Sequence, residues 1–120
     1  MYTIENAGSY IRVVFSGRVN DDDLLNAFKD EVALPDYREK NALWVFDGCE
    51  CDFSHSCYEE LTRYISTYYP RNATRLKTAI LTSNNLHQAL AELFLGQAEE
   101  LTYSIRIFQE QSEADAWLRQ

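Results

Sequence analysis

The side chains best suited to chemistry lie in a short segment near the middle of the chain. Three cysteines and one histidine occur there within nine positions: Cys49, Cys51, His55 and Cys57. Thiolate and imidazole groups are the ligands that zinc prefers, and a structural zinc site takes four of them. Their spacing is not that of a common zinc motif, however, so we predict no metal and no other cofactor.

Ser56 stands three positions before Glu59, which is the spacing of a helix capping box. Such a cap stabilises a helix by about 1 kcal/mol, which is reason enough for a serine there. We therefore interpret Ser56 as a structural cap. The alternative is a phosphorylation switch at Ser56, which would place nearly two negative charges at a helix N-terminus.

The thiols of this segment also suggest redox chemistry, because a thiolate near a helix N-terminus is stabilised and reactive. The same segment carries three acidic residues, Asp47, Glu50 and Asp52. Their negative charge opposes thiolate formation. We expect Cys57 to be partly buried and Cys49 or Cys51 to be exposed.

No catalytic frame accompanies these side chains. The chain has neither the Gly-x-Ser-x-Gly elbow of hydrolases nor a glycine-rich phosphate loop. We therefore predict that the protein is not an enzyme. The alternative is a small enzyme or a redox-sensitive protein that uses a cysteine or histidine of residues 47–57.

Alternating strands and helices must position this segment. Residues 2–5 and 11–15 have the pattern of strands, and Asn6-Ala7-Gly8 between them predicts a hairpin. Gly17 is expected to end the second strand. Leu43-Trp44-Val45-Phe46 is apolar at successive positions, which predicts a central strand buried on both faces. Two further strands are predicted over residues 78–81 and 103–107.

Four helices are predicted between and after these strands. Asn20 caps the first, which has three aspartates in its first turn and ends before Pro35. The others are expected over residues 56–69, from residue 84 or 85 to about Leu101, and from Ser112 towards the end of the chain.

The predicted order of elements is ββαβαβαβα. Strands that alternate with helices imply right-handed crossovers and mostly parallel neighbours. We predict one α/β domain over residues 1–120, with a mixed five-stranded sheet. Ligands of such sheets bind at the loops after the carboxyl ends of the strands, which places the functional surface at residues 47–56 and 82–85.

This order, together with four groups of residues, resembles the SpoIIAA-like family of small bacterial and archaeal proteins, which are related in fold to STAS domains. The residues are Gly17-Arg18-Val19, Val45-Phe46-Asp47, Lys77-Thr78-Ala79-Ile80-Leu81 and the ending from Ile107 to Leu118. The resemblance implies a STAS/SpoIIAA-like fold over nearly the whole chain and no settled biochemical activity. In antagonist STAS domains, a serine that opens the helix after the central strand is phosphorylated. Ser56 falls at that position, although His55 and Cys57 beside it depart from the pattern.

Composition excludes several classes of function. The formal net charge is −8 and the isoelectric point is about 4.6, which opposes binding to nucleic acid and to anionic membranes. No apolar stretch approaches the roughly 18 residues that span a bilayer. The N-terminus has no signal-peptide pattern, and the odd number of clustered cysteines does not suggest a disulfide framework, so we predict a cytoplasmic protein.

We therefore predict a non-enzymatic regulatory or binding module that contacts a partner protein or a small apolar ligand. Its surface is expected to be formed by Asp47, Phe53, Ser54, His55, Ser56, Tyr58, Ser83 and Asn84. An alternative is a homodimer that packs through Tyr64, Tyr68 and Tyr69.

Overall fold

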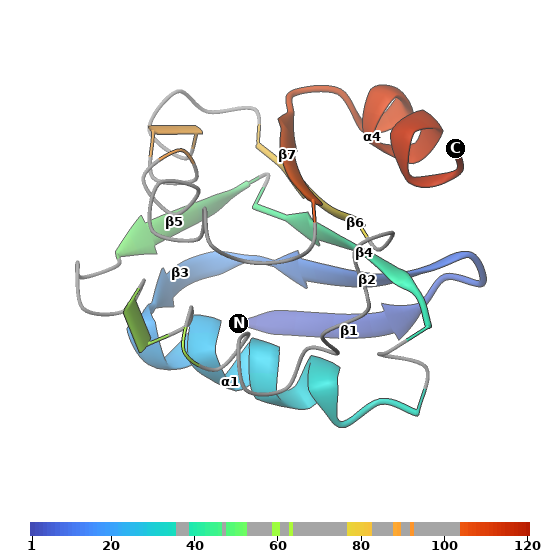
Figure 1. Ribbon diagram of the computed structural model, residues 1–120. Helices are drawn as coiled ribbons and strands as arrows, with labels where there is room; N and C mark the ends of the chain where they lie inside the picture. The colour runs from blue at the N-terminus through green and yellow to red at the C-terminus, as the bar shows by residue number, and fades with distance from the viewer. Residues whose placement is uncertain are drawn as a thin grey trace.

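The structure is a computed structural model that describes residues 1–35, 39–46, 48–52, 59–60, 63, 77–82, 88–89, 92 and 104–120. Its elements are β1 (Tyr2–Asn6), β2 (Tyr10–Phe15), β3 (Gly17–Asn20), α1 (Asp21–Val32), β4 (Asn41–Val45), β5 (Cys49–Asp52), β6 (Lys77–Leu81), β7 (Ser104–Phe108) and α4 (Gln111–Leu118). Five strands form one sheet in the order β1-β2-β4-β6-β7, and β3 pairs with β5 in a second, two-stranded sheet (Figure 1).

The main sheet is mixed, as the sequence predicted. β1 and β2 form an antiparallel hairpin, and the other three pairs are parallel. The hairpin turn is closed by the N–H of Ala7, which donates to the carbonyl of Tyr10 at 2.9 Å, and Gly8 adopts a φ of +86° there. β4 is the middle strand, and the side chains of residues 42–45 are buried on both faces. The predicted hairpin and the predicted central strand are both confirmed.

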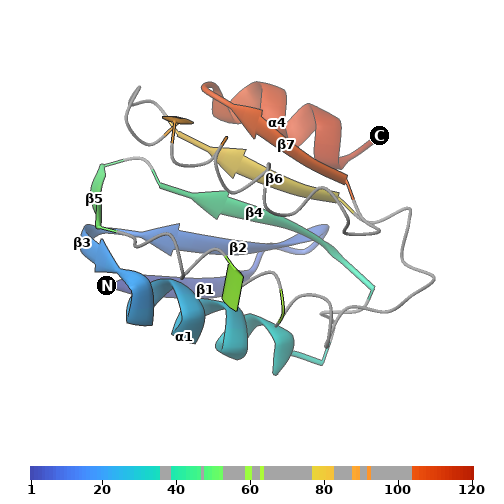
Figure 2. The same cartoon turned by 60° about the vertical axis from the view of Figure 1, so that its left-hand side comes forward.

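Each face of the sheet is covered by a different helix. Side chains that alternate along β4 divide between two apolar clusters, with Trp44 in one and Leu43 and Val45 in the other. The first cluster includes Leu24, Leu25, Ala27 and Phe28 of α1, whereas the second includes Ala114 and Leu118 of α4. The two helices therefore lie on opposite faces of the sheet (Figure 2).

Helix α1 begins where the sequence predicted. The side chain of Asn20 accepts a hydrogen bond from the N–H of Asp23 at 3.0 Å, and the Asp23 carboxylate accepts one from the N–H of Asn20 at 3.1 Å. This reciprocal pair is a capping box. The helix ends at Val32, three residues before Pro35, so it ends before this proline as predicted.

Removing the Asn20 cap should destabilise the protein measurably. We expect Asn20→Ala to lower the free energy of unfolding by about 1 kcal/mol, because the backbone N–H of Asp23 then loses its side-chain acceptor. Urea unfolding followed by circular dichroism would measure this loss. Asn26→Ala, an exposed position later in the same helix, is the matched control, and an equal loss in the two variants would contradict the capping role.

Hydrogen bonds join helix α4 to the sheet near its middle and at its last turn. Near its middle, Asp115 accepts a hydrogen bond from the hydroxyl of Tyr10 at 2.7 Å. At its last turn, the carbonyls of Trp117 and Leu118 accept bonds from the Lys77 ammonium and the Asn41 amide, both at 2.9 Å. The helix begins at Gln111 after Glu110, one residue before the predicted start at Ser112. Glu110 makes no capping hydrogen bond with its side chain, so a capping rule could not have located this start.

The two other predicted helices are described only in part. Glu59, Glu60 and Arg63 are helical, as are Gln88, Ala89 and Glu92, and all six fall inside the predicted ranges. The remaining residues of those ranges lie outside the described part of the chain. Within the described residues, no helix has the length and apolar character needed to cross a membrane.

Candidate functional site

The carboxyl ends of three parallel strands meet at one edge of the main sheet, which we call the rim. Val14 of β2 pairs with Val45 of β4, and Val45 in turn pairs with Leu81 of β6. One residue further on, the N–H of Phe46 donates to the carbonyl of Leu81 at 2.9 Å. The chain therefore leaves β4 and β6 side by side, so that the segments beginning at residues 47 and 83 start from neighbouring points.

A two-stranded extension rises from this rim. β3 follows β2 after Ser16, β5 follows β4 after Gly48, and β3 and β5 pair in parallel at the left of Figure 1. Val14 faces Val45, 31 residues later, whereas Gly17 faces Cys49, 32 residues later. Between these paired positions, the connection from β4 to β5 is thus one residue longer than that from β2 to β3, and we call this step between the two ladders the bulge.

Two features of this region were not predicted. Gly17 was expected to end the second strand, and β2 does end at Phe15, but Gly17 also begins a new strand, β3, with a φ of +67°. Residues 49–52 were expected to be loop, but they form β5. The reason is the same in both cases. Gly17 and Gly48 adopt left-handed conformations that turn both strands together, so the pairing resumes beyond the bulge.

The glycine at the bulge should be required for its conformation and not for space. Gly48 has a φ of +80°, and a Cβ built there meets no atom within 4 Å. We expect Gly48→Ala to lower the free energy of unfolding by roughly 1–2 kcal/mol through backbone strain alone. Chemical denaturation would measure the loss, with exposed Ser16→Ala as the control. A neutral Gly48→Ala would mean that the bulge relaxes at no cost.

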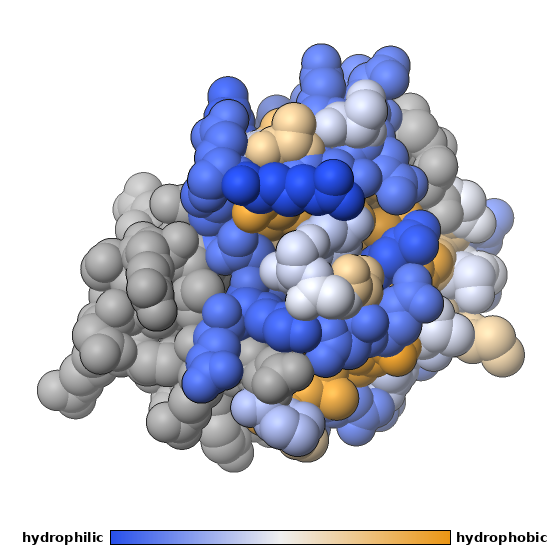
Figure 3. All heavy atoms as spheres, turned by 90° about the vertical axis from the view of Figure 1, so that its right-hand side faces the viewer, coloured by the Kyte–Doolittle hydropathy of each residue, from blue (hydrophilic) through white to orange (hydrophobic). Residues whose placement is uncertain are grey.

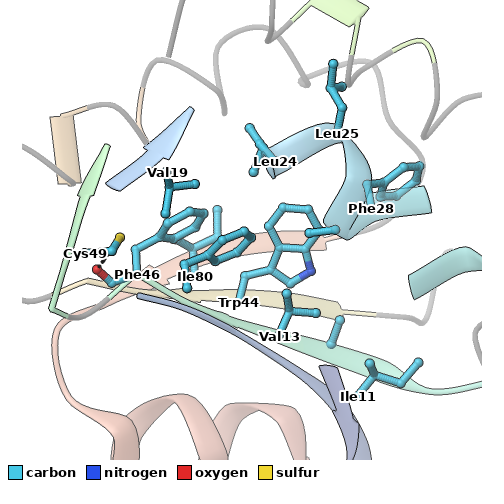
Figure 4. Close-up of a cluster of buried hydrophobic side chains, with 13 residues drawn as sticks. Ile11, Val13, Val19, Leu24, Leu25, Phe28, Trp44, Phe46, Cys49 and Ile80 are labelled. Carbon is cyan, nitrogen blue, oxygen red and sulfur yellow. Dashed lines mark hydrogen bonds between the residues drawn. The ribbon is translucent and has the colours of Figure 1, made fainter. Parts of the chain in front are cut away.

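Beneath the bulge, aromatic side chains from the ends of β2 and β4 pack against each other. The rings of Phe15 and Phe46 stack with their centres 4.6 Å apart and their planes 2° from parallel. Val19 and Cys49 join the same cluster from β3 and β5, and Figure 4 shows them gathered around Phe46. We call this group of buried side chains beneath the rim the apolar floor; it consists of Phe15, Val19, Phe46 and Cys49. A packed layer of this kind supports a binding surface.

Cys49 belongs to this floor. Its side chain is 6% exposed, and its Sγ donates a hydrogen bond to the carbonyl of Phe46 at 3.1 Å (Figure 4). The exposed cysteine was expected to be Cys49 or Cys51; the side chain of Cys51 lies outside the described part of the chain, and Cys49 is buried. In β5 its neighbours Glu50 and Asp52 point to solvent, so alternation along the strand sends the thiol inwards. A buried thiol that donates to a carbonyl is inert packing and not a nucleophile.

The described acidic side chains of the extension do not form a metal site. Asp52 forms an ion pair with Arg18, with 3.1 Å between the carboxylate Oδ2 and the guanidinium Nη2, and both side chains are well exposed. Glu50 is exposed on the same strand. Among the residues that the structure describes, no group of three histidine, cysteine or acidic side chains could hold a metal ion.

The predicted surface residues themselves lie outside the described part of the chain. These are Asp47, Phe53, Ser54, His55, Ser56, Tyr58, Ser83 and Asn84. The same holds for Cys57 and for Tyr64, Tyr68 and Tyr69. What the structure provides is their anchorage, since Phe46 and Thr82 are both buried at the rim, immediately before residues 47 and 83.

A buried carboxyl group on α1 was not predicted from the sequence. Glu31 is 3% exposed, and its Oε2 accepts a hydrogen bond from the indole Nε1 of Trp44 at 3.0 Å. Burial raises the pKa of Glu31 to about 8, although the Trp44 hydrogen bond acts to lower it. Glu31 follows Leu24, Ala27 and Phe28 by seven, four and three positions, so helical spacing already placed it on the apolar face of α1.

The fold has a counterpart among solved structures. The chain is similar to an uncharacterised protein of the DUF3478 family from Shewanella loihica PV-4, whose crystal structure at 2.25 Å resolution is described as having a SpoIIAA-like fold. The TM-score is 0.60, and the similarity covers 98% of this chain and 92% of the other, at 13% sequence identity. The fold is SpoIIAA-like. This agrees with the resemblance drawn from the sequence motifs. No model of a protein family and no curated protein matches the chain.

The edge of this SpoIIAA-like sheet that lies opposite the rim has a different character. It carries the tip of the β1–β2 hairpin and the end of α4, and Figure 3 shows it as mainly hydrophilic, with hydrophobic residues visible in the hollows between polar ones. The described residues of the hairpin tip, 7–9, are all exposed. The two ends of the strands are therefore built differently, and the buried Phe46 and Thr82 belong to the rim.

Proposed function

We propose that this protein is a non-enzymatic regulatory or binding module whose working surface is the rim. The observation that carries the proposal is the register of the parallel strands. It brings the ends of β4 and β6 together, so that the segments beginning at residues 47 and 83 share one origin. In open α/β sheets, ligands bind outside the carboxyl ends of the strands.

The partner that suits this surface is a protein segment or a small apolar molecule. The residues that follow the rim include the aromatic Phe53 and Tyr58 among small polar ones. Binding sites commonly combine an apolar lining with a few polar groups that fix orientation. The SpoIIAA-like fold is compatible with this role but does not specify it.

The burial of Cys49 argues against an enzyme that uses this thiol as its nucleophile. Its thiol is packed in the apolar floor and is occupied by a carbonyl, so it offers no nucleophile at the rim. Alkylation would test whether the other two cysteines, Cys51 and Cys57, are reactive. We expect slow alkylation of Cys49 until the protein unfolds.

Amide NMR of the full chain tests the location of the working surface. Titration with 1-anilinonaphthalene-8-sulfonate, an apolar aromatic probe, should shift signals of residues 46–58 and 82–85. Phe53→Ser should weaken binding of the probe, whereas Ala7→Ser at the opposite edge should leave that binding unchanged. Shifts confined to the hairpin tip, or equal binding by both variants, would refute the placement.

Native mass spectrometry of freshly purified protein complements this titration. It reports any molecule, phosphate or second chain retained from the cell. A stoichiometric apolar molecule or a co-purified partner supports a binding module. A covalent adduct on a cysteine would instead favour redox chemistry.

A further inference from the structure

A second surface with binding potential lies at the β7 edge of the main sheet. β7 is the last strand in the sheet order, and β6 is its only partner among the described strands. Figure 2 shows β7 at this border, with α4 lying beside it. Its side chains are not deeply covered, since Ile105, Ile107 and Phe108 are half-buried and Arg106 is exposed. An unpaired strand edge is a template for an added strand.

Arg106 occupies the middle of this edge strand. Its guanidinium carbon lies 5.6 Å from the centre of the Phe108 ring and 6.0 Å from that of Trp117. The ion pairs found among the described residues join Arg12 to Glu5 and Arg18 to Asp52, so Arg106 has no carboxylate partner within that part of the chain. Stacking on aromatic rings holds a guanidinium in a fixed orientation while its donors remain available.

Lys77 adds a second positive charge on the same face. Its Nζ lies 5.3 Å from the centre of the Trp117 ring while it donates to the Trp117 carbonyl. Two cations thus flank one indole in a chain whose net charge is −8. We call this surface the basic edge, and it consists of Lys77, Arg106, Phe108 and Trp117.

We propose that the basic edge binds an extended acidic peptide of a partner protein, which adds to β7 as a sixth strand and places a carboxylate on Arg106. Backbone hydrogen bonds would supply the pairing, and the charge-assisted bond to Arg106 would supply the selectivity. This interaction goes beyond the proposed function of the rim, because it uses a different border of the sheet.

The register defines the peptide pattern. Side chains directly opposite one another in an antiparallel pair share a face. A peptide residue opposite Arg106 therefore lies on the α4 face and should be acidic. Its two neighbours lie on the face where Ile105 and Ile107 pack against the α1 cluster, and they should be apolar. The preferred core is apolar–acidic–apolar.

Charge argues against two other occupants. A two-fold pairing of β7 with β7 of a second copy, centred on the strand, would place Arg106 against Arg106, and like charges opposite one another are destabilising. A nucleic acid would have to approach a chain of net charge −8.

The test uses the full chain and the peptide acetyl-Ser-Val-Glu-Val-Ser-amide. Peptide titration followed by amide NMR should shift signals of residues 104–108. Replacing the peptide glutamate by glutamine, or Arg106→Gln in the protein, should weaken binding about tenfold, and Arg106→Glu should abolish it. Arg18→Gln is the matched control, because Arg18 is exposed on β3, and it should leave the affinity unchanged.

Several outcomes would overturn the proposal. These are no shifts at millimolar peptide, shifts centred on the β1 edge, and equal affinity of the glutamine peptide or of Arg106→Gln. Arg106-dependent binding of an eight-nucleotide oligothymidine in place of the peptide would also overturn it. Because the peptide and the Arg106 variants avoid the rim, a failure here is distinguishable from a failure of the rim proposal.

Discussion

Glu31→Gln should make the protein more stable at alkaline pH and remove most of the pH dependence of folding between pH 5 and 9. The side chain of Glu31 is buried against Trp44, and burial raises its pKa to about 8. Glutamine has the same shape and accepts the same indole hydrogen bond, but it carries no titratable proton.

The sign follows from proton binding in the two states. Below about pH 4.5 Glu31 is protonated in both the folded and the unfolded chain, and its stabilising contribution is complete. Between pH 4.5 and 8 the unfolded chain loses the proton while the folded chain keeps it, so the free energy of unfolding falls as the pH rises. Above pH 8 both states are ionised and the contribution has been lost. With about 1.4 kcal/mol for each pKa unit, the total is on the order of 5 kcal/mol.

Urea unfolding of wild type and Glu31→Gln at a series of pH values would measure this effect. The two proteins should have similar stability near pH 5 and diverge steadily up to about pH 8. Glu110→Gln makes the same chemical change at an exposed position, and its difference from wild type should be small at every pH. A difference between wild type and Glu31→Gln that stays constant with pH would show that Glu31 is ionised in the folded state.

The indole of Trp44 provides a direct reporter of the same equilibrium. Its N–H donates to the carboxyl group that titrates, so its NMR signal should shift with a midpoint near pH 8. Trp117, the other tryptophan, is contacted on its ring by Lys77 and not by Glu31 in the structure, and its N–H signal serves as an internal reference. The signal of Trp44 should become independent of pH in Glu31→Gln.

The elements that could be predicted from the sequence are those that carry their own signal. A parallel strand buried on both faces must be apolar at successive positions, and Leu43-Trp44-Val45-Phe46 is such a run. The start of α1 is equally local, because Asn20 and Asp23 satisfy each other's backbone. The mixed sheet then follows from the order of the elements.

The β3–β5 extension could not be predicted in this way. Its strands have four residues each, and their pairing depends on two glycines, 31 positions apart, that both adopt positive φ. A glycine before a polar segment more often ends a strand, and only the non-local pairing shows otherwise. The inward turn of Cys49 is a consequence of that pairing, so its burial was missed as well.

The candidate site was placed by the position of its segments and not by its chemistry. The rim lies where the strand order located it, at the ends of β4 and β6. The predicted surface residues remain predictions, because they lie outside the described part of the chain. Glu31 shows the complementary error. Its helical spacing placed a carboxyl group on an apolar face, and that conflict was the signal to follow.

Phe15→Ala should cause the other large effect, a loss of roughly 3–5 kcal/mol in the free energy of unfolding. Phe15 is fully buried and stacks on Phe46 at the bulge, and it also contacts the rings of Tyr2 and Trp44. Truncation removes the transfer energy of the ring and leaves a cavity that the stacked neighbours cannot fill.

Urea unfolding with an unchanged m-value would measure the loss. Val14→Ala is the matched control, because Val14 is the adjacent residue of β2 on the other face and is only half-buried, and it should cost less. If Phe15→Ala does not fold, Phe15→Leu should retain about half of the lost stability. A loss no larger than that of Val14→Ala would contradict the central place of this ring.

The same variant connects the apolar floor to the rim. Phe46 is the last described residue before Gly48, and its stacking on Phe15 continues the contact between β4 and β2 beyond their last paired residues, Val14 and Val45. In Phe15→Leu, amide hydrogen exchange should therefore accelerate at residues 46 and 48–52 more than in the β1–β2 hairpin. Uniform acceleration along the chain would mean that Phe15 supports global stability only, and that the rim does not depend on the aromatic stack beneath it.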